Sequence, residues 1–330
     1  MKLPLILAAA LLAPSAHAQT ALKCPEFAQK VRSVRTLRMQ PLRRGKRWLE
    51  GTPKSIFSVS CDIYGMKTEE AEYDGKNLVL KTAYEYRDKD ASRAICDGLK
   101  SEERLSTTFS DEGGALDEFC RDFRKKDYAA VLAFDASPSQ GRGGARKPVR
   151  QIFRVFNSKG FVTEERSFDA MRNLEGATLY SYDKGNNLSG VTVNDPDGRQ
   201  LKREAFSSDK ATSSRTHSFF GENNELRKKV VEELREDGSL RRVVTSTYDT
   251  GEQPVTRDEV YCDAKGRPEK ELVYDADAAE PKYEYTYSYK YDPKGNWTEE
   301  RKTRVIVYNG NRLADTQYAP EITKREFVYY

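Results

Sequence analysis

Aromatic and polar residues alternate with particular regularity between positions 283 and 291. Every second position is a tyrosine: Tyr283, Tyr285, Tyr287, Tyr289 and Tyr291. The intervening and preceding positions hold polar or charged residues: Lys282, Glu284, Thr286, Ser288 and Lys290. A period of two places the tyrosines on one face of a strand, whereas a helix would scatter them around its circumference. The pattern therefore predicts a strand with a tyrosine face and a wet polar face.

The tyrosine face has two interpretations. The rings could form an exposed ladder that stacks on sugars, because tyrosine combines an apolar ring with a polar tip. Alternatively, they could cover a thin core, because a chain this polar has few other large side chains to bury. The core interpretation is favoured. The candidate binding residues on this face are Tyr283, Tyr285, Tyr287 and Tyr289.

A short motif recurs along the chain: an aromatic residue, Asp or Asn, a nearby Gly, and then an apolar residue. The copies lie at 156–160, 182–185, 248–251, 261–266 and 291–297, with partial copies at 195–198 and 236–238. Asp and Asn bond to the turn backbone and Gly adopts positive φ, so each copy predicts a hairpin whose flanking aromatic and apolar residues face each other. The predicted turn glycines are Gly160, Gly185, Gly198, Gly238, Gly251, Gly266 and Gly295.

The sequence before residue 150 is less regular. Residues 73–77 predict one more hairpin, whereas 91–105 and 115–128 have helical character. Residues 137–150 are rich in Gly, Pro, Ser and Arg, as in a loop or linker. Because single hairpins are unstable alone, neighbours should pair edge to edge. The predicted fold is mainly β: an elongated antiparallel β-hairpin repeat sheet at 151–330, with a small helix-containing N-terminal part at 19–136.

The Tyr-Asp-x-Gly and Tyr-Asp-x-x-Gly turns at 182–185, 248–251 and 291–295 resemble the YD repeats of RHS-like exported and surface proteins of bacteria. The resemblance extends from about residue 150 to 310. It implies a β-hairpin repeat architecture and no agreed activity. The present sequence departs from the family pattern in its irregular spacing and modest length.

The first 18 residues have the pattern of an export signal. Lys2 precedes an apolar run, and Ala16 and Ala18 provide the small residues that cleavage requires. The run is shorter than the roughly 20 residues of a membrane-spanning helix. A transmembrane barrel would need apolar residues at alternate positions, but Lys324 and Glu326 occupy such positions near the C-terminus. The sequence thus predicts a periplasmic or secreted protein without a transmembrane segment.

The composition of the chain argues against some classes of function. The chain has 56 basic and 52 acidic residues, and this near balance is typical of a solvated surface and not of a nucleic-acid binder. A hydrophobic content of 37% favours a thin core. An oxidising compartment makes disulfides plausible, but sequence leaves their pairing open. The cysteines are Cys24, Cys61, Cys96, Cys120 and Cys262.

Catalytic and metal-binding patterns are missing. His217 has no nucleophile motif around it, and no cysteine pair has C-x-x-C spacing. Adjacent acids at 69–70, 232–233 and 299–300 could serve a glycosidase only if both members faced one cleft. The sequence therefore predicts no enzyme, no catalytic residue, no metal site and no cofactor.

A basic stretch that contains no acidic residue lies between Glu26 and Glu50. The candidate binding residues in it are Arg35, Arg38, Arg43, Arg44, Lys46 and Arg47. Such a patch could meet anionic lipid head groups or an anionic envelope polymer, or it could simply protect a sheet edge from aggregation.

The leading hypothesis is a non-catalytic exported protein that binds or scaffolds in the cell envelope. Its partner would be an anionic envelope polymer, lipid head groups or another envelope protein. The alternatives are a secreted hydrolase with an acidic pair, and a surface component of a toxin-delivery or adhesion system.

Overall fold

The computed structural model describes residues 24, 25, 27, 29–87, 90, 92, 94, 95, 127–135, 148–308 and 311–330. The strands in these residues are β1 (Val31–Met39), β2 (Leu42–Arg44), β3 (Arg47–Leu49), β4 (Pro53–Cys61), β5 (Lys67–Asp74), β6 (Asn77–Tyr86), β7 (Asp127–Asp135), β8 (Arg150–Phe156), β9 (Val162–Asp169), β10 (Leu174–Tyr182), β11 (Leu188–Asn194), β12 (Gln200–Asp209), β13 (Ser214–Phe220), β14 (Leu226–Leu234), β15 (Leu240–Tyr248), β16 (Pro254–Cys262), β17 (Pro268–Asp275), β18 (Tyr283–Tyr291), β19 (Trp297–Tyr308), β20 (Asn311–Ala314) and β21 (Glu321–Tyr329).

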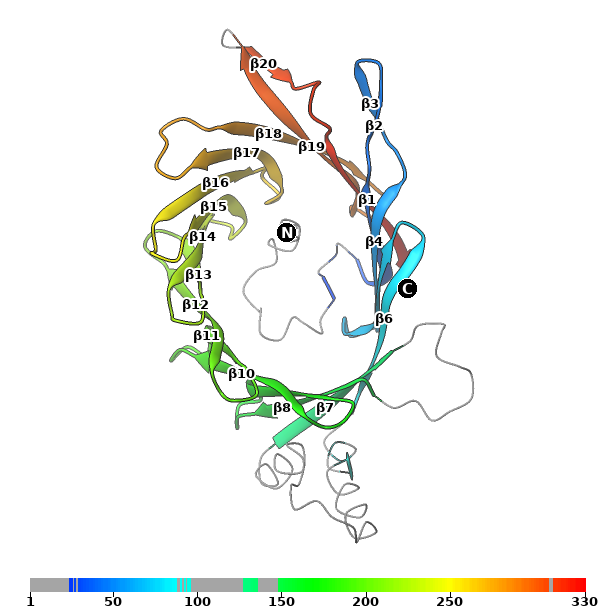
Figure 1. Cartoon of the computed structure of the whole chain (residues 1–330), viewed down its shortest axis with the longest axis vertical. Coiled ribbons are helices and arrows are strands. Elements are labelled where there is room, and N and C mark those ends of the chain that lie inside the picture. The colour runs from blue at the N-terminus through cyan, green and yellow to red at the C-terminus, as the bar shows by residue number, and fades with distance from the viewer. Residues whose placement is uncertain are drawn as a thin grey trace.

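The mainly β, antiparallel architecture is confirmed, but the sheet closes on itself, so the expectation of an elongated shape is corrected. Eighteen strands form the closed barrel (Figure 1). Strand β1 pairs with both β4 and β21, which joins the two ends of the chain. Strand β20 pairs with the end of β19 and flares outward, and β2 and β3 form a separate hairpin. Because strands twist, a long row of hairpins curls, and closure then pairs the edges that an open sheet would expose.

The expected helix-containing N-terminal part is also corrected. Strands β1 and β4–β7 belong to the same sheet as the later strands. Residues 90, 92, 94 and 95 are helical, and the rest of the two expected helical stretches lies outside the described residues, apart from 127 and 128, which begin β7. In the described part of the chain, no helix is long and apolar enough to cross a membrane. The expected signal peptide and residues 137–147 of the expected linker also lie outside the described residues.

Strand pairing divides the side chains into an inner and an outer wall. Cys24 forms a disulfide with Cys61 at the end of β4, and the segment that contains Cys24 lies inside the ring (Figure 1). Residues directly opposite each other in a sheet share a face, so the pairs Val59–Val34 and Val34–Phe327 continue the inner wall around the closure. Turns alternate between two ends of the ring. We call them the disulfide end, which carries Cys24–Cys61, and the hairpin end, which carries β2–β3.

The recurrent turns share one geometry. In each, the N–H of the third residue after the first turn residue donates to the carbonyl of that first residue. The first residue is Asp or Asn at Asn157–Gly160, Asp195–Gly198 and Asp292–Gly295, and it is Arg235 in the turn that contains Gly238. That third residue adopts positive φ, and it is the predicted glycine at five sites: Gly160, Gly198, Gly238, Gly266 and Gly295. Two copies differ, because Asn186 and Glu252 take the positive φ in place of Gly185 and Gly251. The positive φ therefore follows the position in the turn, three residues after the residue whose carbonyl accepts, and does not follow the glycine.

The register confirms that residues flanking each turn face each other. Tyr291 pairs with Trp297, Tyr182 with Leu188, and Phe156 with Val162. Each pair lies next to a register shift, as expected where a turn ends in a bulge.

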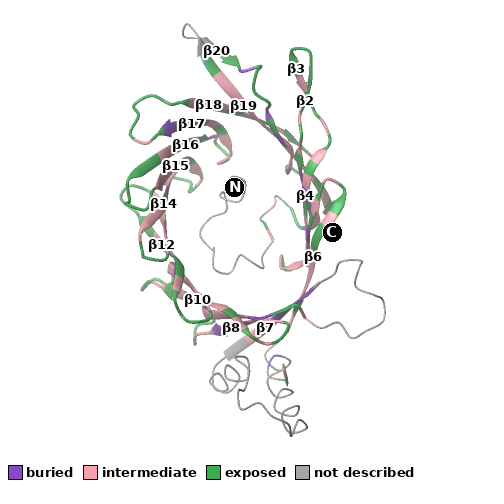
Figure 2. Ribbon diagram, viewed as in Figure 1, coloured by how far each residue is buried: buried purple, intermediate pink, exposed green. Residues whose placement is uncertain are grey.

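Few residues are fully buried (Figure 2), and the buried apolar residues gather most densely in two patches. An inner patch beside the disulfide contains Val31, Val34 and Val59, with Phe27 and Phe327 packed against it. A second patch lies on the outer wall of β7–β9 and is formed by Ala130, Leu132, Phe134, Phe153, Val155 and Phe168. Most other strand residues are half-buried or exposed, as the low hydrophobic content predicted.

We predict that two similar turn glycines respond differently to substitution. Gly198 has φ +82 with open space around it, so Gly198→Ala should lower the free energy of unfolding by about 1–2 kcal/mol through backbone strain alone. Gly251 has an ordinary φ, so Gly251→Ala should change stability by less than about 0.5 kcal/mol. Denaturant unfolding of both variants tests this; equal losses would contradict the turn geometry.

Candidate functional site

The tyrosine face of β18 forms part of the inner wall. Tyr289 pairs with Glu300 and Tyr287 with Lys302, and Glu300 continues to Thr323 on β21, which shares the inner face with Phe327. The four rings Tyr283–Tyr289 are half-buried and lie among charged side chains. The opposite face is wet at Lys282 and Lys290, but Glu284 is buried, contrary to expectation.

Charged side chains surround these rings. The Tyr287 hydroxyl donates to Glu271, and Lys302 forms an ion pair with the same carboxylate at 2.8 Å. The Lys302 ammonium also lies 4.4 Å from the Tyr285 ring centre, and the Arg304 guanidinium lies 4.1 Å from that of Tyr283. Burial and Glu271 hold the pKa of Tyr287 far above its usual value. The wall is therefore an ordered polar network that presents aromatic rings.

Asp258 on β16 borders this network on the same wall. Burial, reinforced by Glu271, raises the pKa of Asp258 to about 6, while Lys302 and Lys228 oppose the increase. One carboxylate oxygen of Asp258 is buried without a hydrogen bond, which agrees with a poorly solvated charge.

His217 also lies on the inner wall, where it is half-buried. Its Nε2 lies 2.9 Å from Glu204, and its ring stacks on Phe206 at 4.2 Å between centres. It contacts Phe219 on the other side at 3.8 Å between centres. These contacts give His217 a structural role in the packing of the inner wall.

The adjacent acids are separated by the strand itself. Glu299 pairs with Lys324 on the outer wall, and Glu300 lies on the inner wall. The same alternation divides 69–70 and 232–233. Neither member of such a pair can share a cleft with its neighbour. Among the described residues there is no group of three or more His, Cys, Asp and Glu side chains that could hold a metal ion.

The candidate basic residues are divided among three places. Arg35 is on the outer wall and forms an ion pair with Glu326 at 3.0 Å, and Arg38 lies exposed near the hairpin end. The other four, Arg43, Arg44, Lys46 and Arg47, are exposed on the β2–β3 hairpin. Trp48 anchors this hairpin through a hydrogen bond to the Thr316 carbonyl at 3.0 Å. The structure therefore gathers four of the six basic residues on one projection (Figure 1).

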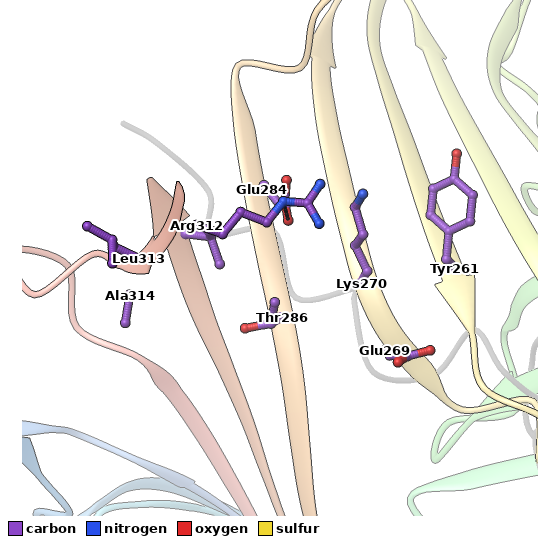
Figure 3. Close-up of a pocket in the computed structure, with 9 residues that line it drawn as sticks. Tyr261, Glu269, Lys270, Glu284, Thr286, Arg312, Leu313 and Ala314 are labelled. Atoms are coloured by element: carbon purple, nitrogen blue, oxygen red, sulfur yellow. Dashed lines mark ion pairs between the residues drawn. The ribbon is translucent and has the colours of Figure 1, made fainter. Parts of the chain in front are cut away.

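An outer hollow lies where β20 leaves the wall. It has a volume of about 530 Å³, and Figure 3 shows Arg312 reaching from β20 toward Glu284 on β18, with Lys270 and Tyr261 farther along. The Arg312–Glu284 ion pair of 3.3 Å neutralises the buried carboxylate. The central charge of the hollow is thus paired with a residue of the hollow itself, although the Glu284 Oε1 atom accepts no hydrogen bond.

An inner hollow of about 630 Å³ lies at the disulfide end. Phe27 of the N-terminal segment closes one side, and Trp297, Tyr291, Arg267 and Arg325 form much of the rest. Sequence reasoning missed both arginines. The charged residues next to the tyrosines could have been predicted from the sequence. The turn at 292–296 fixes the register of β18 and β19, and this register places Glu300, Lys302 and Arg304 opposite the tyrosines.

The disulfide resolves part of the cysteine pairing. Cys24 pairs with Cys61, and Cys262 is buried with a free thiol whose pKa is raised by burial to about 11. Cys96 and Cys120 lie outside the described residues.

We predict that the Tyr287 hydroxyl stabilises the inner wall. Tyr287→Phe should lower the free energy of unfolding by about 1.5–3 kcal/mol, because Glu271 loses a charge-assisted hydrogen bond. Tyr291→Phe is the matched control: its side chain is 40% exposed and its hydroxyl makes no hydrogen bond among the described residues. Denaturant unfolding compares the two, and equal stabilities would contradict the network.

We also predict a pH-dependent gain from neutralising Asp258. Its pKa of about 6 lies above the ordinary 3.8, so the folded protein holds this proton to higher pH than the unfolded chain. The charge therefore destabilises the fold above about pH 6, and the penalty is gone below about pH 4. Asp258→Asn should raise the melting temperature at pH 8 and leave it unchanged near pH 4. Asp197→Asn, in an exposed turn, is the control; a pH-independent shift in Asp258→Asn would exclude this explanation.

Comparison with known proteins gives no family assignment. No family model matches the chain. No curated protein matches it either. A porin-like protein from Bacteroides uniformis shows a TM-score of 0.39 and 10% identity, covering 90% of this chain and 98% of its own. A protein of unknown function from Bacteroides fragilis shows a TM-score of 0.23 and 13% identity, covering 41% and 95%.

A structure of TcdB2-TccC3-Cdc42 shows a TM-score of 0.22 and 12% identity, covering 88% of this chain and 16% of that one. TM-scores this low do not establish a shared fold. The resemblance to YD repeats therefore continues to rest on the turn motifs of the sequence.

Proposed function

We propose that this protein is a non-catalytic binding module of the cell envelope that docks on an anionic lipid head-group surface through the β2–β3 hairpin. The observation that carries the proposal is the set of four exposed cations on this projection. None of Arg43, Arg44, Lys46 and Arg47 forms an ion pair with a described acid. Elsewhere, many bases are paired, as at Lys324–Glu50 beside the hairpin base, where the distance is 2.6 Å.

Exposed leucines favour lipid over a soluble polymer. Leu42 and Leu49 pair across the hairpin and are 57% and 44% exposed. Together with the cations they form a surface that suits the boundary between head groups and acyl chains. Trp48 and Arg43 contact residues 316 and 317, which holds the hairpin in a fixed orientation.

The compartment and the outer wall support the same proposal. The Cys24–Cys61 disulfide fits an oxidising envelope compartment. The outer wall carries ion pairs such as Lys290–Glu299 and Arg35–Glu326, which suit water more than lipid tails. Contact with lipid would therefore be limited to the projecting hairpin.

The test removes three hairpin charges. A variant with Arg44, Lys46 and Arg47 changed to Ser should bind vesicles of phosphatidylglycerol and phosphatidylcholine about a hundredfold more weakly, since each base near an anionic surface contributes about 1 kcal/mol. Cosedimentation measures the affinity, and added salt should weaken binding of the unmodified protein.

The matched control removes three exposed bases from other turns, Lys76, Lys184 and Lys210, and should bind like the unmodified protein. Equal weakening in both triple variants would point to net charge and not to the hairpin. Binding to soluble polyphosphate but not to vesicles would replace lipid by an anionic polymer as the partner.

A further inference from the structure

The inner hollow at the disulfide end contains a guanidinium that forms no ion pair with any of the described residues. Arg325 forms no hydrogen bond or ion pair with a described residue, and its Nε is buried without a partner. Glu300 attracts it only at longer range, and burial lowers the pKa of Arg325 to about 10. A partly buried charge still loses solvation when it lacks a partner, so this position favours an added acceptor.

Aromatic rings hold this guanidinium in place. Arg325 lies 3.7 Å from the Trp297 ring centre and 5.9 Å from that of Phe27. Such cation–π contacts orient the planar group but leave its edge N–H groups for another acceptor. An oxyanion that accepts two parallel hydrogen bonds is the natural partner.

A second arginine lines the hollow with a different status. Arg267 is fixed by Asp263, with its Nε donating at 2.8 Å, and stacks 4.8 Å from the Tyr291 ring centre. Its charge is compensated within the turn. Of the two arginines, Arg325 is therefore the one left to meet a ligand's negative charge.

The dimensions and walls of the hollow define the rest of the ligand. A volume of about 630 Å³ is in the range of small-molecule sites. Phe27 and Tyr291 offer apolar ring surface, and Lys265 offers an ammonium group. Aromatic rings pack against the C–H faces of sugars while polar groups bond to the hydroxyls.

We propose that this hollow binds an anionic sugar of monosaccharide or disaccharide size, with its carboxylate or phosphate against Arg325. The site lies at the disulfide end, and the β2–β3 hairpin lies at the other end of the ring. It is therefore a second binding function, independent of docking on lipid.

The two tryptophans make the test direct. Trp48 lies on the hairpin and Trp297 lies beneath Arg325, so the Trp48→Phe variant reports on the hollow through Trp297 fluorescence alone. Glucuronate, glucose 6-phosphate, glucose and inorganic phosphate are titrated separately. One or both anionic sugars should change the emission saturably, while glucose should bind at least tenfold more weakly. Which of them binds distinguishes carboxylate from phosphate.

In the Trp48→Phe background, Arg325→Gln should weaken binding of the anionic sugar at least tenfold. Arg325→Lys keeps the positive charge but loses the two parallel donors of the guanidinium, so its affinity should lie between those of the parent and of Arg325→Gln. Arg301→Gln removes the same charge from the outer wall and should bind normally. Melting temperatures verify folding of each variant. Unchanged affinity in Arg325→Gln, equal affinity for glucose, or affinity for inorganic phosphate equal to that for the sugars would overturn the proposal.

Discussion

The ladder between β1 and β21 is the interaction on which the rest of the structure depends. It runs from Val31–Tyr329 to Met39–Ile322 and joins the two ends of the chain into one ring. Without it, β1 and β21 would be the two edge strands of an open sheet, with unpaired backbone groups. Closure also creates the difference between an inner and an outer wall. The tyrosine face of β18, the Glu271–Lys302 pair and the hollow beneath Phe27 all acquire their surroundings from it.

The polar composition of the chain reflects its inner wall, which is held together by hydrogen bonds, ion pairs and cation–π contacts in place of an apolar core. Tyr287, Glu271 and Lys302 are held together by a hydroxyl donor and an ion pair, and cations lie on the neighbouring rings. These contacts specify geometry more than they add stability, because burying charge is costly even when it is paired. The raised pKa values of Tyr287 and Asp258 express that cost. Apolar packing is densest at the closure beside Cys61 and in the outer patch of β7–β9.

Local features of the fold could be predicted from the sequence. The Asp-x-x-Gly turns, the pairing of Tyr291 with Trp297 and the common face of the tyrosines follow from contacts within about a dozen residues. Closure could not be predicted, because the match between β1 and β21 leaves no local pattern. The buried Glu284 and the isolated Arg325 were missed for the same reason: their environments come from Arg312 on β20 and from Phe27 at the other end of the chain. The basic hairpin could be predicted because a cluster of basic residues is visible in the local sequence. That Arg35 lies apart from this hairpin, on the outer wall, could not be predicted.

The closing ladder also fixes an order of events in time. Arg35 and Glu326 meet across 291 residues of sequence, whereas neighbouring hairpins such as β18–β19 pair across a single turn. A chain synthesised from its N-terminus can therefore zip up its hairpins one after another, but β1 must wait until the last strand has appeared. Until then the growing sheet has two open edges that can recruit strands from other chains. Pairing of β21 with β1 is thus the step that removes both open edges at once.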